Sequence, residues 1–314
     1  MTRLGLLAGS GAAVLLALAW FAMPGWLGFL MTVALAKGLV VLGVVLLMRG
    51  GLVSFGQGLF FAGGAYAAGF LINLWGVREA LILILAGTLT GAALSLVTGL
   101  LIARYREIFF AMLTLAFSMT LWGVLLKAYE ITGGSDGLRI GPPTFLGMEP
   151  RGASLRLANY YLTLACAASV AFLVYRFMES PLGHRMRAIR DNEIRVGYLG
   201  GSVKKAVLTT FVLAGALGGL GGVLQAMSVG QIDPTLAYWT TSGEFVFVAL
   251  IGGGGSVIAP LVGAVAFEVI RAYALKYMPD MWQMTLGMVM LLIVLFLPSG
   301  LWGVYERAVG RARA

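Results

Sequence analysis

The chain has 314 residues, of which 60% are hydrophobic and only 11% are charged, and its mean hydropathy is +0.94. Soluble domains are about 45–50% apolar and about 25% charged, so the composition excludes a water-soluble enzyme. Intrinsic disorder is excluded as well, because it requires low hydrophobicity. The single cysteine, Cys166, excludes an intramolecular disulfide and a cysteine-based zinc cluster. We therefore expect an all-α, polytopic membrane protein in which residues 1–314 form one transmembrane domain.

Apolar segments of membrane-spanning length follow one another along the chain. A spanning helix needs about 20 mostly apolar residues, and the segments that qualify are 5–23, 29–48, 52–74, 79–103, 108–127, 159–177, 206–228, 243–275 and 281–298. The first has the features of a secretory signal, with Arg3 before the apolar stretch and Ala-Leu-Ala at 17–19. Because many spans follow, we interpret it as a retained helix. The expectation is about eight to ten membrane segments.

Glycine spacing predicts close contact between several of these spans. The chain contains 45 glycines, and in lipid such residues allow helix backbones to approach closely. Gly87 with Gly91, Gly215 with Gly219, and Gly218 with Gly222 have the small-xxx-small spacing.

The segment 243–275 is too long for one span and is interrupted by four glycines, Ser256 and Pro260. A half-helix, a glycine turn and a returning helix fit this pattern, with a kinked helix as the alternative. Irregular backbone within a membrane occurs where protein or a water-filled cavity covers it, and it marks translocation pathways. Residues 50–74 contain a similar series of glycines, so the sequence leaves open whether they cross the membrane fully or form a re-entrant segment.

Lysine and arginine predict the orientation of the spans. With the N-terminus inside, the inner segments hold about twice as many basic residues as the outer ones, as the positive-inside rule requires. This topology gives an external loop at about 128–158, a cytoplasmic loop at about 178–205 and a cytoplasmic tail at about 299–314. Both termini are then cytoplasmic. The net charge of +9 is explained by these clusters at the lipid bilayer, so no nucleic-acid partner is expected.

Patterns of catalytic residues are weak in this chain. Residues 133–137 match the Gly-x-Ser-x-Gly nucleophile motif, but His184, the single histidine, falls in the cytoplasmic loop, across the membrane from it. No lysine follows a glycine, so the chain lacks a Walker element for ATP. No histidine pair is present to ligate a metal. We expect neither enzymatic activity nor a metal site.

Ionisable residues inside spans are costly and are functional candidates when present. They are few here: Lys37 in the second segment, and Glu244, Glu268 and Arg271 in or near the broken one. This scarcity argues against a carrier coupled to protons or sodium and indicates that another polypeptide supplies the energy.

Residues 180–193 predict a short helix, capped by Ser180 with Pro181 in its first turn. Three apolar side chains share one face of it: Leu182, Met186 and Ile189. Arg187 and Asp191 are spaced to pair along its surface. Two interpretations stay open, an amphipathic helix on anionic lipid or a helix that docks in a groove of a cytoplasmic partner.

The sequence resembles the permease subunits of branched-chain amino acid ABC importers, in the LivM-like branch. The resemblance covers roughly residues 40–300 and depends on four stretches in the family order. They are Gly-Leu-Val-Ser-Phe-Gly-Gln-Gly at 51–58 with Gly-Ala-Tyr at 64–66, Thr-Gly-Gly-Ser-Asp-Gly-Leu at 132–138, residues 183–193 with Gly200 and Lys204, and Gly-Gly-Gly-Gly-Ser at 252–256 leading to Pro260, Gly263 and Ala264.

The resemblance implies a permease that works by alternating access and forms half of a translocation pathway. Its implied partners are a second homologous permease subunit, two cytoplasmic ATPase subunits and an external solute-binding protein. ATP and Mg would be bound by the ATPase subunits, and no cofactor by this chain. The ATPase-coupling residues would be Gly183, Arg187, Ala188, Ile189, Arg190, Asp191, Asn192 and Glu193.

Two further groups of residues are candidates for the translocation path or its gate. They are Thr132, Gly133, Gly134 and Ser135 in the external loop, and Gly252, Gly253, Gly255 and Ser256 in the broken segment. The solute stays open among a branched-chain amino acid, another amino acid, an amide and urea. The alternative function is a stand-alone secondary carrier or facilitator for a small polar solute, with Lys37 and Glu244 as coupling residues.

Overall fold

The computed structural model describes residues 24–297 and 300–304. The predicted first span, 5–23, and most of the predicted tail lie outside the described residues. The helices are α2 (Gly25–Met48), α3 (Gln57–Trp75), α4 (Ala80–Ile102), α5 (Glu107–Lys127), α6 (Tyr129–Thr132), α7 (Ala153–Met178), α8 (Pro181–Tyr198), α9 (Val203–Val229), α10 (Trp239–Gly252), α11 (Ala259–Tyr277) and α12 (Trp282–Phe296). The 3-10 helices are η2 (Gly134–Asp136) and η3 (Pro234–Ala237), and two short strands, β1 (Leu138–Arg139) and β2 (Gln231–Ile232), pair antiparallel.

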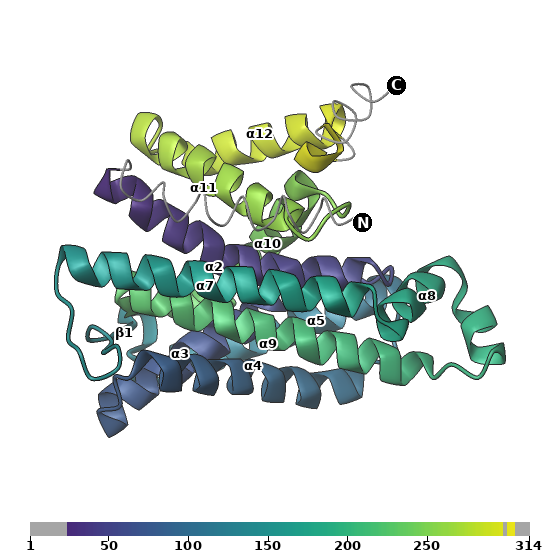
Figure 1. The fold of residues 1–314 in the computed structure, drawn as a ribbon, viewed down its shortest axis with the longest axis horizontal. Coiled ribbons are helices and arrows are strands. Elements are labelled where there is room, and N and C mark those ends of the chain that lie inside the picture. Colours follow the sequence, from purple (N-terminus) through teal and green to yellow (C-terminus); the bar gives the residue numbers. More distant parts are fainter. Residues whose placement is uncertain (1–23, 298–299, 305–314) are drawn as a thin grey trace.

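The described part of the chain is an all-α bundle, which confirms the predicted fold class. Among the described residues, six helices are long and apolar enough to cross a membrane: α2, α3, α4, α5, α7 and α9. In Figure 1, α2, α4, α7 and α9 run side by side along the long axis, and α10, α11 and α12 form a group on one side of α2. The segment containing α8 projects from one end of this bundle, and β1 with its loop lies at the other.

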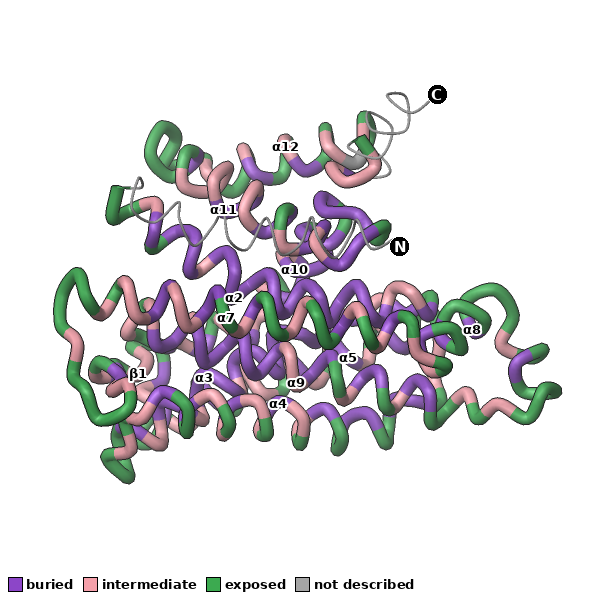
Figure 2. Tube along the Cα trace, viewed as in Figure 1, coloured by how far each residue is buried: buried purple, intermediate pink, exposed green. Residues whose placement is uncertain are grey.

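The core forms around α2, which is buried along nearly its whole length (Figure 2). Helix α9 packs between α2, α3 and α4, and the glycine pairs predicted from the sequence lie at these contacts. A Cβ atom added at Gly64 or Gly91 would collide with the α9 backbone at Gly219 or Gly215. Side chains on the outer face of α4 are exposed leucines, such as Leu85 and Leu89, which is the surface expected toward lipid.

The broken segment is two helices rather than one kinked helix. Helix α10 ends at Gly252, α11 begins at Ala259, and the two pack against each other. Arg49 Nη2 donates a hydrogen bond of 3.4 Å to the Gly254 carbonyl oxygen, which places the turn at the end of the bundle where α8 lies. The half-helix, turn and returning helix predicted from the glycine run are therefore present.

Two stretches that are not α-helical lie before α3 and before α10 and contact α5. Residues 49–56 precede α3, and there the Phe55 N–H donates to Thr114 Oγ1 on α5 at 3.1 Å. The stretch that contains β2 and η3 precedes α10, and there Ser118 Oγ on α5 donates to the Ala237 carbonyl oxygen at 2.8 Å. The segment predicted at 50–74 thus contains one helix of 19 residues, Gln57–Trp75, with an irregular entry before it.

Candidate functional site: the α8 segment and the intramembrane ion pairs

Helix α8 begins as the sequence predicts and then bends. Ser180 Oγ accepts a hydrogen bond of 3.3 Å from the Gly183 N–H, and Pro181 occupies the first turn. At Asn192 the backbone leaves helical geometry (φ −163°, ψ 102°). The Asn192 Oδ1 atom accepts from the Arg195 N–H at 2.8 Å, so the bend residue caps the short helical part that follows it.

The apolar face of α8 is covered by the chain itself. Met186 and Ile189 are 1% and 5% exposed and belong to a cluster that includes Phe110 and Val207. Gly183 is also buried, and an added Cβ would collide with carbonyl oxygens at the end of α7. This face therefore meets neither lipid nor a partner's groove, and the two open interpretations are wrong about it. Of the predicted coupling residues, Gly183 and Ile189 face the bundle.

The opposite face of α8 is exposed and basic. It carries the predicted coupling residues Arg187, Ala188, Arg190, Asp191 and Asn192, together with His184 and Arg185. The ion pair that sequence spacing allowed between Arg187 and Asp191 is absent from the described part of the chain.

Beyond the bend, three large apolar side chains are exposed: Ile194 (71%), Tyr198 (88%) and Leu199 (82%). Sequence reasoning missed this apolar tip. Ile194 and Tyr198 lie four residues apart and out of phase with the buried face, which is the signal that marks a second apolar surface.

Glu193, the last predicted coupling residue, pairs with Arg106 in the turn between α4 and α5. The Arg106 Nε and Nη2 atoms lie 2.7 Å and 3.1 Å from the two carboxylate oxygens. Arg106 Nη1 also donates to the Ala103 and Tyr105 carbonyl oxygens at 2.8 Å and 2.7 Å. The two side chains are 23% and 40% exposed. Glu193 therefore binds the bundle rather than presenting itself to a partner.

The predicted loop residues Thr132, Gly133, Gly134 and Ser135 form a turn at the β1 end of the bundle. Thr132 is buried, and its hydroxyl donates to the Leu125 carbonyl oxygen at 2.6 Å. Gly133 and Gly134 adopt left-handed backbone (φ 72° and 52°), where other residues are strained. Ser135 is exposed.

The second predicted path group forms the turn between α10 and α11. Gly252, Gly253 and Ser256 are buried, and Gly255 is exposed. The structure thus does not bring the two predicted path groups together, because they lie at opposite ends of the bundle.

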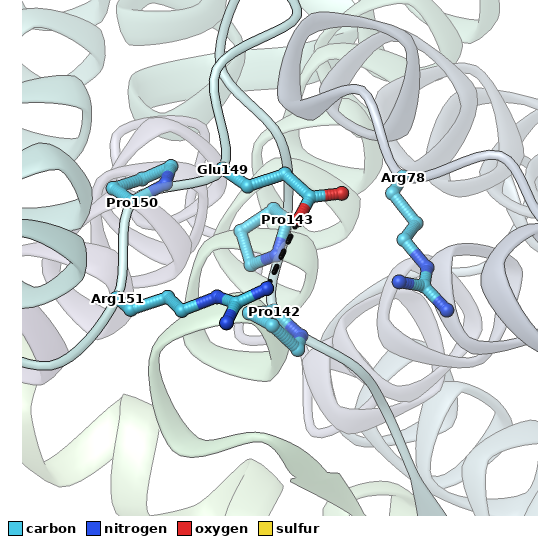
Figure 3. Close-up of a pocket in the computed structure, with 6 residues that line it drawn as sticks. All are labelled: Arg78, Pro142, Pro143, Glu149, Pro150 and Arg151. Carbon is cyan, nitrogen blue, oxygen red and sulfur yellow. Dashed lines mark hydrogen bonds and ion pairs between the residues drawn. The ribbon is translucent and has the colours of Figure 1, made fainter.

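A cavity of about 200 Å³ lies at the β1 end, lined by Arg78, Pro142, Pro143, Glu149, Pro150 and Arg151. Arg151 Nη2 pairs with Glu149 Oε2 at 3.4 Å on one side, and Arg78 lies on the other (Figure 3).

Beside this cavity, Glu79 holds the loop between α6 and α7 in place through hydrogen bonds. It accepts hydrogen bonds from the Leu146 N–H at 2.8 Å and the Thr144 hydroxyl at 3.0 Å. These bonds, the Leu146 bond first, hold the pKa of the Glu79 carboxylate below its ordinary value.

The intramembrane ionisable residues form one charge-balanced group, which we call the ionic quartet: Lys37, Glu244, Glu268 and Arg271. Lys37 Nζ lies 2.7 Å from Glu244 Oε1 and 2.6 Å from Glu268 Oε1. Arg271 Nη1 lies 3.3 Å from Glu244 Oε1, and its guanidinium lies 5.4 Å from the ring centroid of Trp282. The quartet connects α2, α10 and α11, and its formal charges sum to zero. Within the described ranges, no group of three or more His, Cys, Asp or Glu side chains could hold a metal.

Comparisons with known proteins agree with this architecture. The family model described as branched-chain amino acid transport system, permease component, matches residues 26–295. The chain is 28% identical over 314 residues to the high-affinity branched-chain amino acid transport system permease protein LivM of Escherichia coli, covering 92% of this chain and 73% of that protein. It is 24% identical over 271 residues to the LivH permease protein of the corresponding system in Salmonella typhimurium, covering 81% and 86%.

A sugar permease is also similar. The galactose/methyl galactoside import permease protein MglC of Escherichia coli is 28% identical over 194 residues, covering 60% of this chain and 56% of that protein. No solved structure matches. Since the family model spans most of the described helices, the chain belongs to the family of permease components of branched-chain amino acid transport systems, and it is a multi-pass, membrane-spanning permease subunit of an ABC importer.

Proposed function

We propose that this importer carries a small zwitterionic solute, in the first place a branched-chain amino acid. The proposal is supported by the family match over residues 26–295 and by the amino acid permeases among the relatives. In it, the chain forms half of the pathway beside a second homologous permease. Two ATPase subunits drive the pair, and an external binding protein delivers the solute.

The observation that carries the mechanism is the exposed surface of α8. It combines a row of basic side chains with the apolar tip of Ile194, Tyr198 and Leu199. Tyrosine and arginine are enriched among the residues that dominate protein interfaces. In our proposal the ATPase subunits bind this surface and hydrolyse Mg-ATP themselves, because the chain has no Walker element. In this proposal the α8 end of the bundle is cytoplasmic, and so are both termini, as the distribution of lysine and arginine predicts.

In our proposal, the attachment of α8 to the bundle links ATPase binding to alternating access. Its apolar face packs on the bundle, so a displacement of the exposed surface moves the ends of the neighbouring helices with it. In this scheme the turn at 252–256 belongs to the inner gate and the loop at 132–135 to the outer gate.

The secondary carrier, with Lys37 and Glu244 as coupling residues, is the weaker alternative. Both residues are already engaged in the charge-balanced ionic quartet, which leaves no unpaired carboxylate there for a driving ion.

The test is affinity capture of the chain from gently solubilised native membranes, followed by mass spectrometry. We expect Walker-motif ATPases and a second permease to co-purify. Arg190→Glu and Tyr198→Glu should each reduce ATPase capture and solute-stimulated ATP hydrolysis by about tenfold or more, with membrane insertion unchanged. Arg151→Glu, an exposed arginine at the β1 end, is the matched control and should keep ATPase capture. Recovery of a lone chain that transports under an ion gradient would refute the proposal.

A further inference from the structure

We propose that the pair of Arg106 and Glu193 transmits the movement of α8 to α5, and through α5 to both irregular stretches of the pathway. Arg106 is thereby a positioning residue for transport. This inference rests on the proposed function, in which the ATPase subunits bind the exposed surface of α8.

The pair lies at the junction between the embedded part of α8 and its exposed tip. Glu193 directly follows the bend at Asn192, which separates the part of α8 embedded in the bundle from the exposed tip. Its carboxylate accepts two parallel hydrogen bonds from the Arg106 guanidinium, at 2.7 Å and 3.1 Å. Such two-bond pairs fix orientation as well as distance.

Arg106 is itself held by hydrogen bonds within the turn between α4 and α5. Its remaining nitrogen donates to the Ala103 and Tyr105 carbonyl oxygens, so four of the five guanidinium N–H groups are engaged. The Arg106 carbonyl oxygen accepts from the Phe110 N–H at 3.3 Å in the first turn of α5. A displacement of Glu193 is therefore passed through Arg106 to the first turn of α5.

The start of α5 is held against its intrinsic preference. Glu107, the first residue of the helix, has a positive φ of 51°, a region that non-glycine residues seldom occupy. Such conformations persist where the surroundings impose them, and they cluster at switch regions. The residue directly before Glu107 is Arg106, which its hydrogen bonds to Glu193 and to the Ala103 and Tyr105 carbonyl oxygens hold in place.

Helix α5 then reaches both irregular stretches. Thr114 Oγ1 accepts from the Phe55 N–H before α3, and Ser118 Oγ donates to the Ala237 carbonyl oxygen before α10. Irregular backbone of this kind marks the pathway in transporters built from broken helices. One helix thus connects the bend of α8 with both discontinuities.

The experiment uses the complete importer, reconstituted in vesicles with its second permease, ATPase subunits and binding protein. Arg106→Gln, Glu193→Gln and the double variant are compared for solute transported per ATP hydrolysed. We expect each single variant to lower this ratio at least about fivefold with unchanged subunit composition. Because the two residues act as one unit, the double variant should be no worse than either single one.

Two further variants complete the design. Arg104→Gln is the matched control and should keep the ratio, because Arg104 lies in the same turn and its guanidinium donates to the neighbouring Tyr105 hydroxyl rather than to α8. Arg106→Lys keeps the charge without the two-bond geometry and should lie between wild type and Arg106→Gln, which also answers the case in which a glutamine variant folds poorly.

An unchanged ratio in the single variants would overturn the inference. So would losses that multiply in the double variant, or a loss of ATPase subunits from the variant complexes, since the latter would make the pair a docking contact. If the wild-type chain itself captures no ATPase, the proposed function fails and the inference fails with it, whereas a failure confined to the variants leaves the proposed function standing.

Discussion

Removing the Lys37 ammonium by Lys37→Met should destabilise the whole bundle. Lys37 lies midway along α2 and is 9% exposed, and it contacts Glu244 and Glu268, which are 18% and 11% exposed, at 2.7 Å and 2.6 Å. After the substitution, the carboxylates of Glu244 and Glu268 share Arg271 as their remaining cationic neighbour. Arg271 lies 3.3 Å and 3.8 Å from them and is 30% exposed, so it compensates for Lys37 only in part.

Breaking a buried ion pair by removing one partner costs about 3–5 kcal/mol. Arg271 compensates in part, so we expect the lower end of this range, about 3 kcal/mol. The corresponding decrease in melting temperature is at least about 5 °C for a chain of this size. The charge-balanced double variant, Lys37→Met with Glu268→Gln, leaves Glu244 paired with Arg271 and should recover most of the loss, because replacing a whole buried pair is close to neutral.

The assay is the fraction of monodisperse protein that survives stepwise heating in detergent, measured by size-exclusion chromatography. Lys276→Met removes an exposed lysine near the end of α11 and serves as the control, with an expected change within about 0.5 kcal/mol. The reasoning is refuted if Lys37→Met melts with this control, or if the double variant is less stable than Lys37→Met alone.

Two further predictions concern packing and pH. Gly222→Ala should destabilise the protein by about 1–3 kcal/mol, because the new methyl group would collide with the Phe61 carbonyl oxygen. The control is Gly287→Ala, which has open space around its Cβ position and should be neutral or slightly stabilising in the same heating assay. The Glu79 pKa is lowered in the folded state, so its stabilisation of the loop that carries Leu146 is present above the unfolded pKa and is lost as the pH falls through the folded pKa. Hydrogen-exchange protection of the Leu146 amide should therefore fall on acidification and should already be low at neutral pH in Glu79→Gln; protection that does not change with pH in the wild-type protein would contradict this.

Local signals in the sequence predicted most helix positions closely. The segments predicted at 79–103 and 108–127 are helices at Ala80–Ile102 and Glu107–Lys127, because the length of an apolar run is itself the condition for spanning lipid. The cap at Ser180 and the glycine turn after α10 were predictable for the same reason. Each depends on residues a few positions apart.

The roles of the α8 residues were only partly predictable. Periodicity identified the apolar face of Met186 and Ile189 but left open what covers it, and the structure covers it with the chain's own helices. Periodicity also missed the apolar tip, because the backbone at Asn192 is not helical. The helical repeat of the first part of α8 therefore does not continue to Ile194 and Tyr198.

The sequence by itself determined that this is an all-α membrane permease, which helices it has and which polar residues its spans contain. Only the tertiary structure decided how its charged residues pair, both at the α8 end and inside the spans: Arg106 with Glu193 across 87 positions, and Lys37 with Glu268 across 231. Hydropathy and helical periodicity are properties of neighbouring residues. The partner of a buried charge is chosen instead by which helices the whole fold brings within hydrogen-bond distance, since a charge in lipid must find an opposite one wherever the packing places it.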